Sequence, residues 1–403
     1  MEKQAGIKPE KLEVFRNILI QKINELLGEA GKTVSEMTNG KENFPDPTDR
    51  ASLEADRNFE LRIRDRERKL IVKMQEAIKR IDDGTYGICE SCGGPISEKR
   101  LMARPVTTEC IDCKTKQEKM EKLKGEDILV TWDQQMDEGL YRDLDLMAFC
   151  AASTGFDAAD IEAATKNGVM VTNAKDYCVD EVSAHAIMLL LACGRRIYHV
   201  TDNVDRGDWS VNGIGSVKRL KGSTVGIFAF GSIARGVAEK LKGFDVRMIS
   251  YDPYVGEEVM EAYGVEKVEF ETLLIESDYI TIHSPLTEET RGMFSKEALS
   301  RTKEGVVIVN TARGAIVDQE ALYHMLKSGR IVAAGLDVLT HEPPTEAEKG
   351  LLELSNVIVT PHSGYFSDQA QEQQLRITAR DVGRIARGER PVNLRNGEVV
   401  SGK

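Results

Sequence analysis

The chain has 403 residues, of which 41% are hydrophobic and 30% charged, and its formal net charge is −12. A chain of this length is expected to form two or three domains with separate cores. The acidic excess lies wholly after residue 124, which disfavours direct DNA binding because phosphate contacts need a basic surface. The sequence has neither an apolar run long enough for a membrane span nor a signal-peptide pattern, so we expect a cytoplasmic protein.

Residues 1–84 are predicted to form a coiled-coil hairpin. Between residues 12 and 37, apolar side chains recur in steps of three and four, which is typical of a coiled-coil seam. A segment with one glycine and two prolines, residues 38–50, ends this pattern. A second amphipathic stretch over residues 70–81 then supplies the returning helix.

The turn between these helices carries Asp46 and Asp49 at the expected tip of the hairpin. Spacing alone favours a simple interpretation, in which Thr48 or Asp49 caps the second helix.

Residues 85–124 are predicted to hold a zinc finger and a helix after it. They contain a C-x2-C-x17-C-x2-C arrangement made by Cys89, Cys92, Cys110 and Cys113. Four thiolates at this spacing predict a closed, tetrahedral and therefore structural Zn²⁺ site. A redox pair is the weaker interpretation, because two pairs occur together and no thioredoxin-like pattern surrounds them.

The first part of the chain resembles the DksA/TraR regulators of bacterial RNA polymerase. The resemblance covers residues 10–120 and is carried by NFPDPTDRA, ELRIRDRERKL, YGICESCGGPI, RLMARP and CIDCK. It implies that the hairpin enters the secondary channel of the polymerase, with three tip residues near its active site: Asp46, Asp49 and Ala51. It also implies a guanosine-tetraphosphate site shared with the polymerase, formed by Arg66, Lys73 and Lys114. Taken alone, these three cations indicate only a solvated helix face.

Beyond residue 125, short apolar runs alternate with helical stretches. The runs are ILVTW, LMAFCAAS, VMVTNA, TVGIFAF, VRMISYD, YITIHS, VVIVN, IVAAGLD and NVIVTPH. Such alternation predicts βαβ units around a mainly parallel, doubly wound sheet of the α/β Rossmann type. Runs that do not alternate, such as VVIVN, indicate strands buried on both faces.

The segment TVGIFAFGSIARGVAEKLKGF predicts a strand, a tight turn and a helix that binds a dinucleotide. Its A-F-G-S-I-A turn departs from GxGxxG, with Ala229 at the first glycine and Ala234 at the last. Asp252 ends the next strand, where a carboxylate can bind the ribose hydroxyls. No arginine lies beside it, so the pattern favours NAD over NADP.

This second part resembles the D-isomer-specific 2-hydroxyacid dehydrogenases from about Asp127 to Asn393. HSPLTEETRGMF, VNTARGAIVD, GLDVLTHEPP, TPHSGYFS and DYCVDEVSAHAIMLLLACGRR carry the resemblance. It implies three catalytic residues: His362, Glu342 and Arg313. A histidine can donate a proton to a ketone oxygen, and a glutamate can orient its ring and favour the imidazolium. An arginine can bind the substrate carboxylate.

The same resemblance implies the residues that line the cleft. Backbone donors for a small 2-keto or 2-hydroxy acid are expected at Ser153, Thr154 and Gly155. Residues expected to bind NAD(H) are Gly231, Ser232, Ile233, Asp252, Ser284, Thr311 and Asp337. The other histidines are interpreted as structural or solvated: His185, His199, His283, His324 and His341.

The resemblance also predicts the domain boundaries. The NAD-binding Rossmann domain is expected at residues 201–362, and the substrate domain at residues 125–200, completed by residues 363–395. Two βα units that open the family's flavodoxin-like substrate domain are missing, so only a partial domain is expected. The strand from Ile128 to Trp132 then becomes a sheet edge.

The two resemblances predict a DksA-like regulator fused to an NAD-dependent D-2-hydroxyacid dehydrogenase, dimeric through the Rossmann half near DNVDRGDWS. One alternative is a pure regulator whose second half senses NAD(H) or dimerises without catalysis. Another is an ordinary dehydrogenase that carries an inert finger as an oligomerisation arm.

Overall fold

The computed structural model describes residues 7, 9–39, 47–132, 134–397 and 399, with the backbone alone at residues 9, 29–39 and 47–64. The chain divides into two compact units, which we call unit 1 (Met1–Lys124) and unit 2 (Gly125–Lys403). No helix in the described ranges has the length and apolar character needed to cross a membrane.

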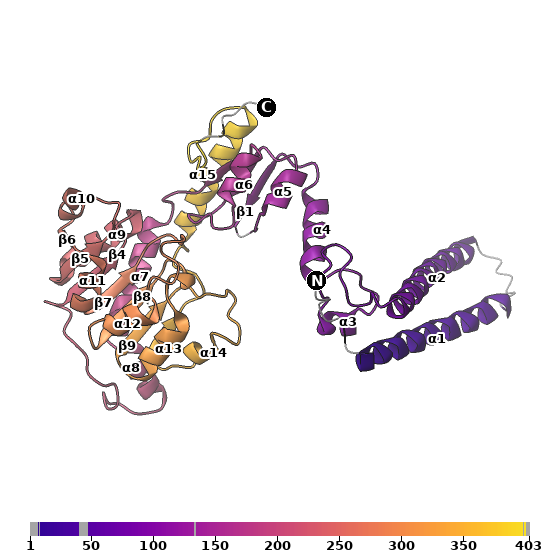
Figure 1. Ribbon diagram of the computed structural model, residues 1–403, viewed down its shortest axis with the longest axis horizontal. Helices are drawn as coiled ribbons and strands as arrows, with labels where there is room; N and C mark the ends of the chain where they lie inside the picture. The colour runs from indigo at the N-terminus through magenta and orange to yellow at the C-terminus, as the bar shows by residue number, and fades with distance from the viewer. Residues whose placement is uncertain (1–6, 8, 40–46, 133, 398, 400–403) are drawn as a thin grey trace. The chain divides into compact units, whose positions relative to one another are not determined.

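Unit 1 is a helical hairpin followed by a small finger (Figure 1). Its helices are α1 (Pro9–Asn39), α2 (Pro47–Asp82), α3 (Glu98–Ala103) and α4 (Ile111–Leu123). At the base of the hairpin, Phe15 and Leu19 of α1 share a buried cluster with Met74 and Ala77 of α2. Leu101 of α3 joins the same cluster, so the finger and the hairpin have one core. The helical pairing predicted from apolar spacing is confirmed.

Helix α2 begins at Pro47, a residue type suited to the first helical turn. Thr48 and Asp49 therefore lie inside this turn rather than ahead of it. The interpretation of either residue as the helix cap is wrong. Asp46, which precedes the helix, lies outside the described residues.

Unit 2 begins with a three-stranded parallel sheet in the order β1-β2-β3. Its elements are β1 (Ile128–Thr131), α5 (Glu138–Asp143), β2 (Ala148–Ala151), α6 (Ile161–Lys166) and β3 (Met170–Asn173). Ile128 is in register with Ala148, which in turn is in register with Met170. Among the strands described, β1 pairs only with β2, so the predicted sheet edge is confirmed.

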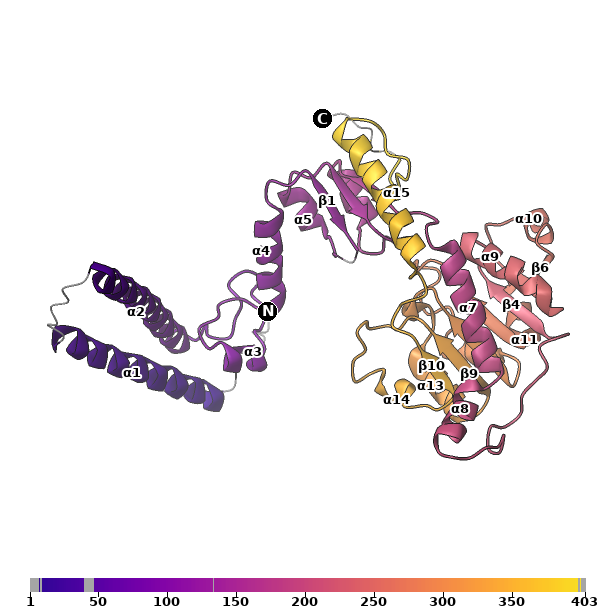
Figure 2. The same ribbon diagram turned by 180° about the vertical axis from the view of Figure 1, so that it is seen from behind.

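The C-terminal segment returns to this small sheet. Helix α15 (Asp368–Ala386) runs alongside it (Figure 2), and Ile385 packs against Ala148 and Met170 in one buried cluster. After the helix, Leu394 forms an antiparallel bridge with Thr172 of β3. The three strands are therefore covered by residues far away in the sequence.

The larger part of unit 2 is a seven-stranded parallel sheet in the order β10-β9-β8-β7-β4-β5-β6. Its strands are β4 (Thr224–Phe228), β5 (Arg247–Tyr251), β6 (Val265–Lys267), β7 (Tyr279–Ile282), β8 (Val306–Asn310), β9 (Ile331–Leu336) and β10 (Val357–Val359). Every residue of β8 is buried, as its unbroken apolar run predicted.

Helices cover both faces of this sheet (Figure 1). They are α7 (Val179–Gly194), α8 (Ile197–Asp205), α9 (Ser232–Leu241), α10 (Glu257–Glu261), α11 (Phe270–Glu276), α12 (Lys296–Arg301), α13 (Gln319–Lys327) and α14 (Lys349–Leu352), with short 3-10 turns η1 (Lys242–Phe244) and η2 (Gly314–Ile316). Residues of α7 and α9 form one buried cluster with the sheet, and residues of α11, α12 and α13 form another.

Helix α7 lies inside the range assigned from the sequence to the substrate domain. Its Ala186, Leu189 and Leu190 nevertheless belong to the buried cluster of the seven-stranded sheet. A helix that is apolar on most faces fits either core, and the sequence pattern does not say which sheet it covers.

Candidate active site and zinc site

The predicted dinucleotide turn lies between β4 and α9. Ala229 adopts a positive φ of 68°, and Gly231 stands directly before the first residue of α9. A Cβ built on Gly231 would meet no heavy atom within 4 Å. The helix N-terminus is therefore open at Gly231, where its N–H groups and dipole suit a pyrophosphate.

Ala229 holds this turn in a conformation that costs a non-glycine residue about 1–2 kcal/mol. We expect Ala229→Gly to stabilise unit 2 by about 1 kcal/mol, which raises Tm by about 2–4 °C for a domain of this size. Ala234→Gly, the same exchange inside helix α9, should lower stability. Thermal unfolding followed by circular dichroism checks both, and a lower Tm for Ala229→Gly contradicts the strain at this turn.

Asp252 has a structural task in the same turn. Its Oδ2 accepts from the backbone N–H of Phe230 at 2.8 Å, and its Oδ1 accepts from the N–H of Tyr254 at 2.8 Å. Asp252 is buried. Any hydrogen bond to a ribose would be added to these two, since each carboxylate oxygen has two lone pairs.

Two other predicted cofactor residues follow the carboxyl ends of neighbouring strands. Ser284 follows β7, and its buried hydroxyl has no hydrogen-bond partner among the described residues. Thr311 follows β8, with its hydroxyl 3.4 Å from Nδ1 of His283. An orphaned hydroxyl at this edge of a parallel sheet fits a polar ligand such as the nicotinamide ribose.

His362 and Glu342 form a close pair. Nδ1 of His362 lies 2.6 Å from Oε2 of Glu342, and Oε1 of Glu342 accepts from the N–H of Leu339 at 2.9 Å. Burial raises the pKa of Glu342, but the hydrogen bonds from His362 and Leu339 outweigh burial and lower the pKa below its ordinary value. Glu342 is therefore ionised and fixes the histidine ring with Nδ1 protonated.

The carboxylate of Asp337 supports the turn that carries His362. The Asp337 side chain is 3% exposed, and it accepts from the N–H groups of Ser363 and Gly364, each at 2.9 Å. Thr360 donates to it at 2.6 Å, and His185 lies 3.4 Å away. Burial raises the pKa of Asp337, yet these hydrogen bonds lower it overall.

These contacts show what Asp337 and His185 do in the fold. Asp337 is predicted from the sequence to bind NAD(H), and its carboxylate accepts hydrogen bonds within the protein that support the turn carrying His362. His185 was interpreted as structural or solvated, and its Nε2 lies 3.0 Å from Oγ1 of Thr360 in this support. A histidine in the middle of a helical apolar run gives no sequence signal for that contact.

Arg313 meets the predicted carboxylate-binding loop. Its guanidinium pairs with Asp157, two residues after Gly155. Within the loop, the Ser153 hydroxyl donates to the carbonyl of Gly155 at 2.6 Å. The Thr154 carbonyl accepts from the side chain of Asn173 at 2.5 Å. Asp157 is not among the site residues predicted from the sequence; its only signal is its place two residues after the Ser-Thr-Gly run.

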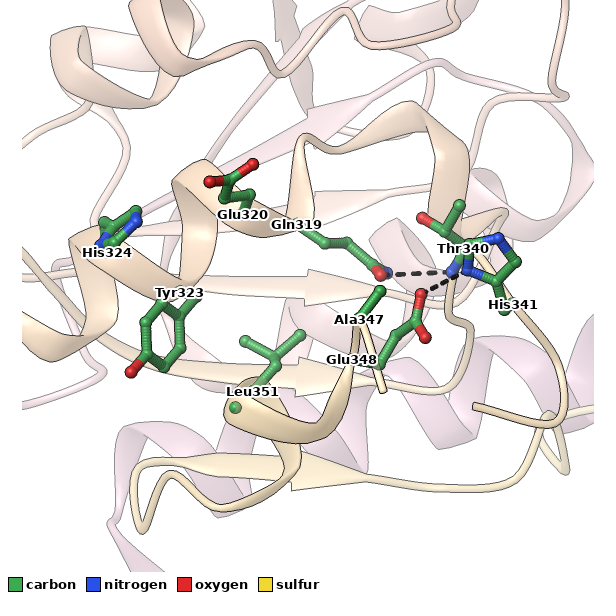
Figure 3. A pocket seen from close by; sticks show the side chains of 10 residues that line it. Gln319, Glu320, Tyr323, His324, Thr340, His341, Ala347, Glu348 and Leu351 are labelled. Carbon is green, nitrogen blue, oxygen red and sulfur yellow. Dashed lines mark hydrogen bonds and ion pairs between the residues drawn. The ribbon is translucent and has the colours of Figure 1, made fainter. Parts of the chain in front are cut away.

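A separate pocket of about 630 Å³ lies between α13 and residues 340–351 (Figure 3). His341 and Glu348 meet there, with Nδ1 of His341 2.6 Å from Oε1 of Glu348. The other oxygen of Glu348 accepts from the N–H and the hydroxyl of Thr345, both at 2.8 Å. Glu348 therefore fastens the loop that carries Glu342.

This anchor predicts a pH-dependent stability. Burial raises the pKa of Glu348, but the bonds from His341 and Thr345 lower it to about 2, against an ordinary 4.5. A depressed pKa stabilises the fold above pH 4.5, and the stabilisation disappears as pH falls towards 2. Glu348→Gln should therefore cost about 1–3 kcal/mol at neutral pH and progressively less between pH 4.5 and 2.

Urea unfolding of both proteins across this pH range measures the difference. A difference that stays constant down to pH 2 contradicts the role of the Glu348 charge.

The four predicted zinc ligands come together in unit 1. Their sulfur atoms all lie within 4.8 Å of one another, and those of Cys92 and Cys110 are 3.9 Å apart. Four sulfurs about 2.3 Å from a tetrahedral Zn²⁺ are separated by about 3.8 Å. Gly93, directly after the first Cys pair, adopts a positive φ of 70°, and its N–H donates to the carbonyl of Cys89. The donor set and its spacing fit zinc.

The residues implied for polymerase and nucleotide binding are only partly described. Asp49 and Ala51 lie in the first turns of α2, with the backbone alone described. Arg66 and Lys73 are exposed on α2, and Lys114 on α4 donates to Gln117 at 2.8 Å.

Comparison with known proteins gives three matching family models. Residues 187–364 match the NAD-binding domain of D-isomer-specific 2-hydroxyacid dehydrogenases. Residues 11–81 match the N-terminal domain of DnaK suppressor protein DksA, and residues 84–119 match the prokaryotic DksA/TraR C4-type zinc finger. The fold and its sites thus define a dinucleotide-binding protein joined to a zinc-binding one.

Similar whole proteins are dehydrogenases and reductases. A glyoxylate reductase from Thermococcus litoralis is 38% identical over 290 residues, which cover 70% of this chain and 87% of the relative. A D-3-phosphoglycerate dehydrogenase from Methanocaldococcus jannaschii is 38% identical over 288 residues, but the chain spans about half (54%) of its length. The D-lactate dehydrogenase of Aquifex aeolicus, solved with NAD and lactic acid, has a TM-score of 0.65 at 28% identity; the match covers 69% of this chain and 89% of that one.

The chain belongs to the D-isomer-specific 2-hydroxyacid dehydrogenase family. It is a fusion, because DksA-type hairpin and finger domains precede the dehydrogenase part. The matching domains identify structural Zn²⁺ and NAD(H) as its cofactors.

Proposed function

We propose that unit 2 reduces a small 2-keto acid to the D-2-hydroxy acid with NADH, and that unit 1 binds bacterial RNA polymerase. The pairing of His362 with Glu342 at 2.6 Å is the observation that supports the reductase most directly.

The proposed chemistry converts a ketone into an alcohol. When bound, NADH supplies the hydride that forms the new C–H bond. His362 donates a proton from Nε2 to the ketone oxygen, while its Nδ1 stays hydrogen-bonded to ionised Glu342. Glu342 stabilises the protonated ring before transfer and keeps its orientation afterwards.

Arg313 and the loop from Ser153 to Gly155 would bind the substrate carboxylate. A guanidinium presents paired N–H donors that match a carboxylate, and Arg313 lies against Gly155 of this loop. Relatives named glyoxylate reductase and hydroxypyruvate reductase make short 2-keto acids the first substrates to test.

The test is a titration of the full-length protein with NADH, glyoxylate, hydroxypyruvate and pyruvate, followed by NADH absorbance. Reaction with at least one acid, and none with the matching amide, supports the proposal. NADH binding without turnover of any acid refutes the reductase.

The proposed partner of unit 1 is RNA polymerase at its secondary channel, which implies a cytoplasmic location. The DksA-type hairpin and finger support this proposal. Tip contacts through Asp46, Asp49 and Ala51, and a guanosine-tetraphosphate site at Arg66, Lys73 and Lys114, are parts of the same proposal.

Transcription in vitro with purified bacterial polymerase tests this half. Wild-type protein should change open-complex lifetime, and the Asp46→Ala/Asp49→Ala double variant should bind but lose the effect. Indistinguishable behaviour of the two proteins contradicts the tip assignment.

A pure regulator that senses NAD(H) is the second candidate. The positive φ of Ala229 and the three-stranded substrate sheet favour it, because both depart from an unstrained and complete dehydrogenase. It predicts NADH binding without turnover, together with transcription that depends on the NADH/NAD⁺ ratio.

We also propose a homodimer through the Rossmann half. Around α8, large apolar side chains are exposed at Tyr198, Val204 and Trp209, and Trp209 is 90% exposed. Sedimentation of wild type and Trp209→Glu tests this, and a monomeric wild type contradicts it.

A further inference from the structure

The guanidinium of Arg313 is held on two sides by the protein. A guanidinium has five N–H groups, divided between Nε and two Nη atoms. Nε donates to Oδ2 of Asp157 at 2.8 Å, and Nη2 lies 2.8 Å from the same oxygen. Nη1 donates to the carbonyl of Ala312 at 2.7 Å.

The two hydrogen bonds come from Nε and Nη1, while Nη2 contacts Asp157 only as an ion pair. One N–H on Nη1 and the N–H groups on Nη2 donate no hydrogen bond to the residues that the structure describes. In a planar guanidinium, Nη1 and Nη2 form a second edge beside the edge made by Nε and Nη2. Its paired N–H donors have the spacing that a carboxylate accepts.

The lack of a side chain at Gly155 makes room for this arrangement. A Cβ built on Gly155 would overlap Nη2 of Arg313 and lie 3.0 Å from Oδ2 of Asp157. A side chain at residue 155 would therefore move the guanidinium. The absence of a side chain allows the loop backbone, the arginine and Asp157 to lie against one another.

We propose that Asp157 is a positioning residue, which binds the Nε/Nη2 edge of Arg313 and so turns its Nη1/Nη2 edge to the substrate carboxylate. This inference rests on the proposed reductase function. Asp157 does not touch the reacting atoms; it acts through Arg313. Without Asp157, Arg313 keeps its charge, but its N–H donors are no longer held in one direction. Misplacement of a binding group by about 1 Å can cost about 100-fold in rate.

Changing Asp157 should leave the fold intact. The side chains of Arg313 and Asp157 are 30% and 40% exposed, and ion pairs as exposed as this stabilise a protein little. Asp157→Asn is a matched variant, because both contacts to Arg313 use a single oxygen, which the amide oxygen of Asn can replace. Asp157→Ala removes the acceptor altogether.

The test is calorimetric titration of the full-length protein, saturated with NADH, with oxamate and with its neutral analogue oxamide. Oxamate carries the carboxylate beside a carbonyl but accepts no hydride, so its binding is measured without turnover. We expect Asp157→Ala to weaken oxamate about ten-fold or more, with NADH affinity unchanged. Its preference for oxamate over oxamide should shrink, and Asp157→Asn should retain most of the affinity.

Oxamate binding to Asp157→Ala that equals or exceeds that of wild type overturns the positioning role, because Asp157 is then idle or competes with the substrate. Equal weakening in Asp157→Ala and Asp157→Asn also overturns it, since charge rather than the clamp would matter. If wild type with NADH binds no oxamate, the proposed reductase function fails and this role fails with it.

Discussion

His362→Ala is expected to lower kcat for 2-keto acid reduction by about 10²–10⁴-fold, the usual contribution of a general acid. The ring is held by Glu342 at 2.6 Å and by the turn that Asp337 supports. The variant should bind NADH as wild type does, because no described contact joins His362 to the dinucleotide turn at Gly231. Steady-state rates and NADH titration together measure both quantities.

His324→Ala is the matched control. His324 lies on α13 and lines the neighbouring pocket (Figure 3), which does not include His362 or Glu342 among its lining residues. We expect its kcat to remain within about two-fold of wild type, as for surface changes away from a site. A His362→Ala variant as active as His324→Ala contradicts the assignment of the proton donor.

Removal of zinc is expected to unfold the finger of unit 1. Structural zinc in small domains binds with about 10–16 kcal/mol, which equals or exceeds the total stability of a typical domain, about 5–15 kcal/mol. Cys89, Leu101 and Phe15 share one buried cluster. Loss of the finger should therefore also loosen the base of the hairpin. Unit 2, with cores of its own, should keep its NADH affinity.

The Cys110→Ser variant tests the zinc-binding role of Cys110 separately from its role as the cap of α4. The sulfur of Cys110 accepts from the N–H of Cys113 at the start of α4, and serine is also a favoured cap. The variant should therefore lose zinc but keep the cap. Metal analysis should give one zinc per wild-type chain and none in the variant, with fast hydrogen exchange over residues 84–119. Slow exchange without metal contradicts a structural role for zinc.

Much of the fold follows from local sequence patterns. The short apolar runs after residue 125 mark nine of the ten strands in the described part of the chain, because strands of a parallel sheet covered by helices need few polar residues. The exception is β6 (Val265–Lys267), a three-residue strand with only Val265 buried. Its apolar content is too small to stand out from a loop.

The sites contain contacts that sequence patterns predict and contacts that they do not. The four cysteine sulfurs meet because the two C-x2-C pairs and the spacer determine their own local geometry. Asp157 reaches Arg313 across 156 residues of chain, and His185 reaches Thr360 across 175. Such pairings depend on how two sheets and α7 pack, which residue spacing does not reveal. The positive φ of Ala229 likewise appears only in the folded turn.

The most direct test of the proposed reductase measures the transfer of hydride from NADH to the substrate. Full-length protein is incubated with hydroxypyruvate and NADH that carries deuterium at the transferable position, and the product is analysed by mass spectrometry and chiral chromatography. We predict D-glycerate with one deuterium on C2, formed by wild type and His324→Ala but hardly by His362→Ala. Product without deuterium, L-glycerate, or equal product from all three proteins would contradict it.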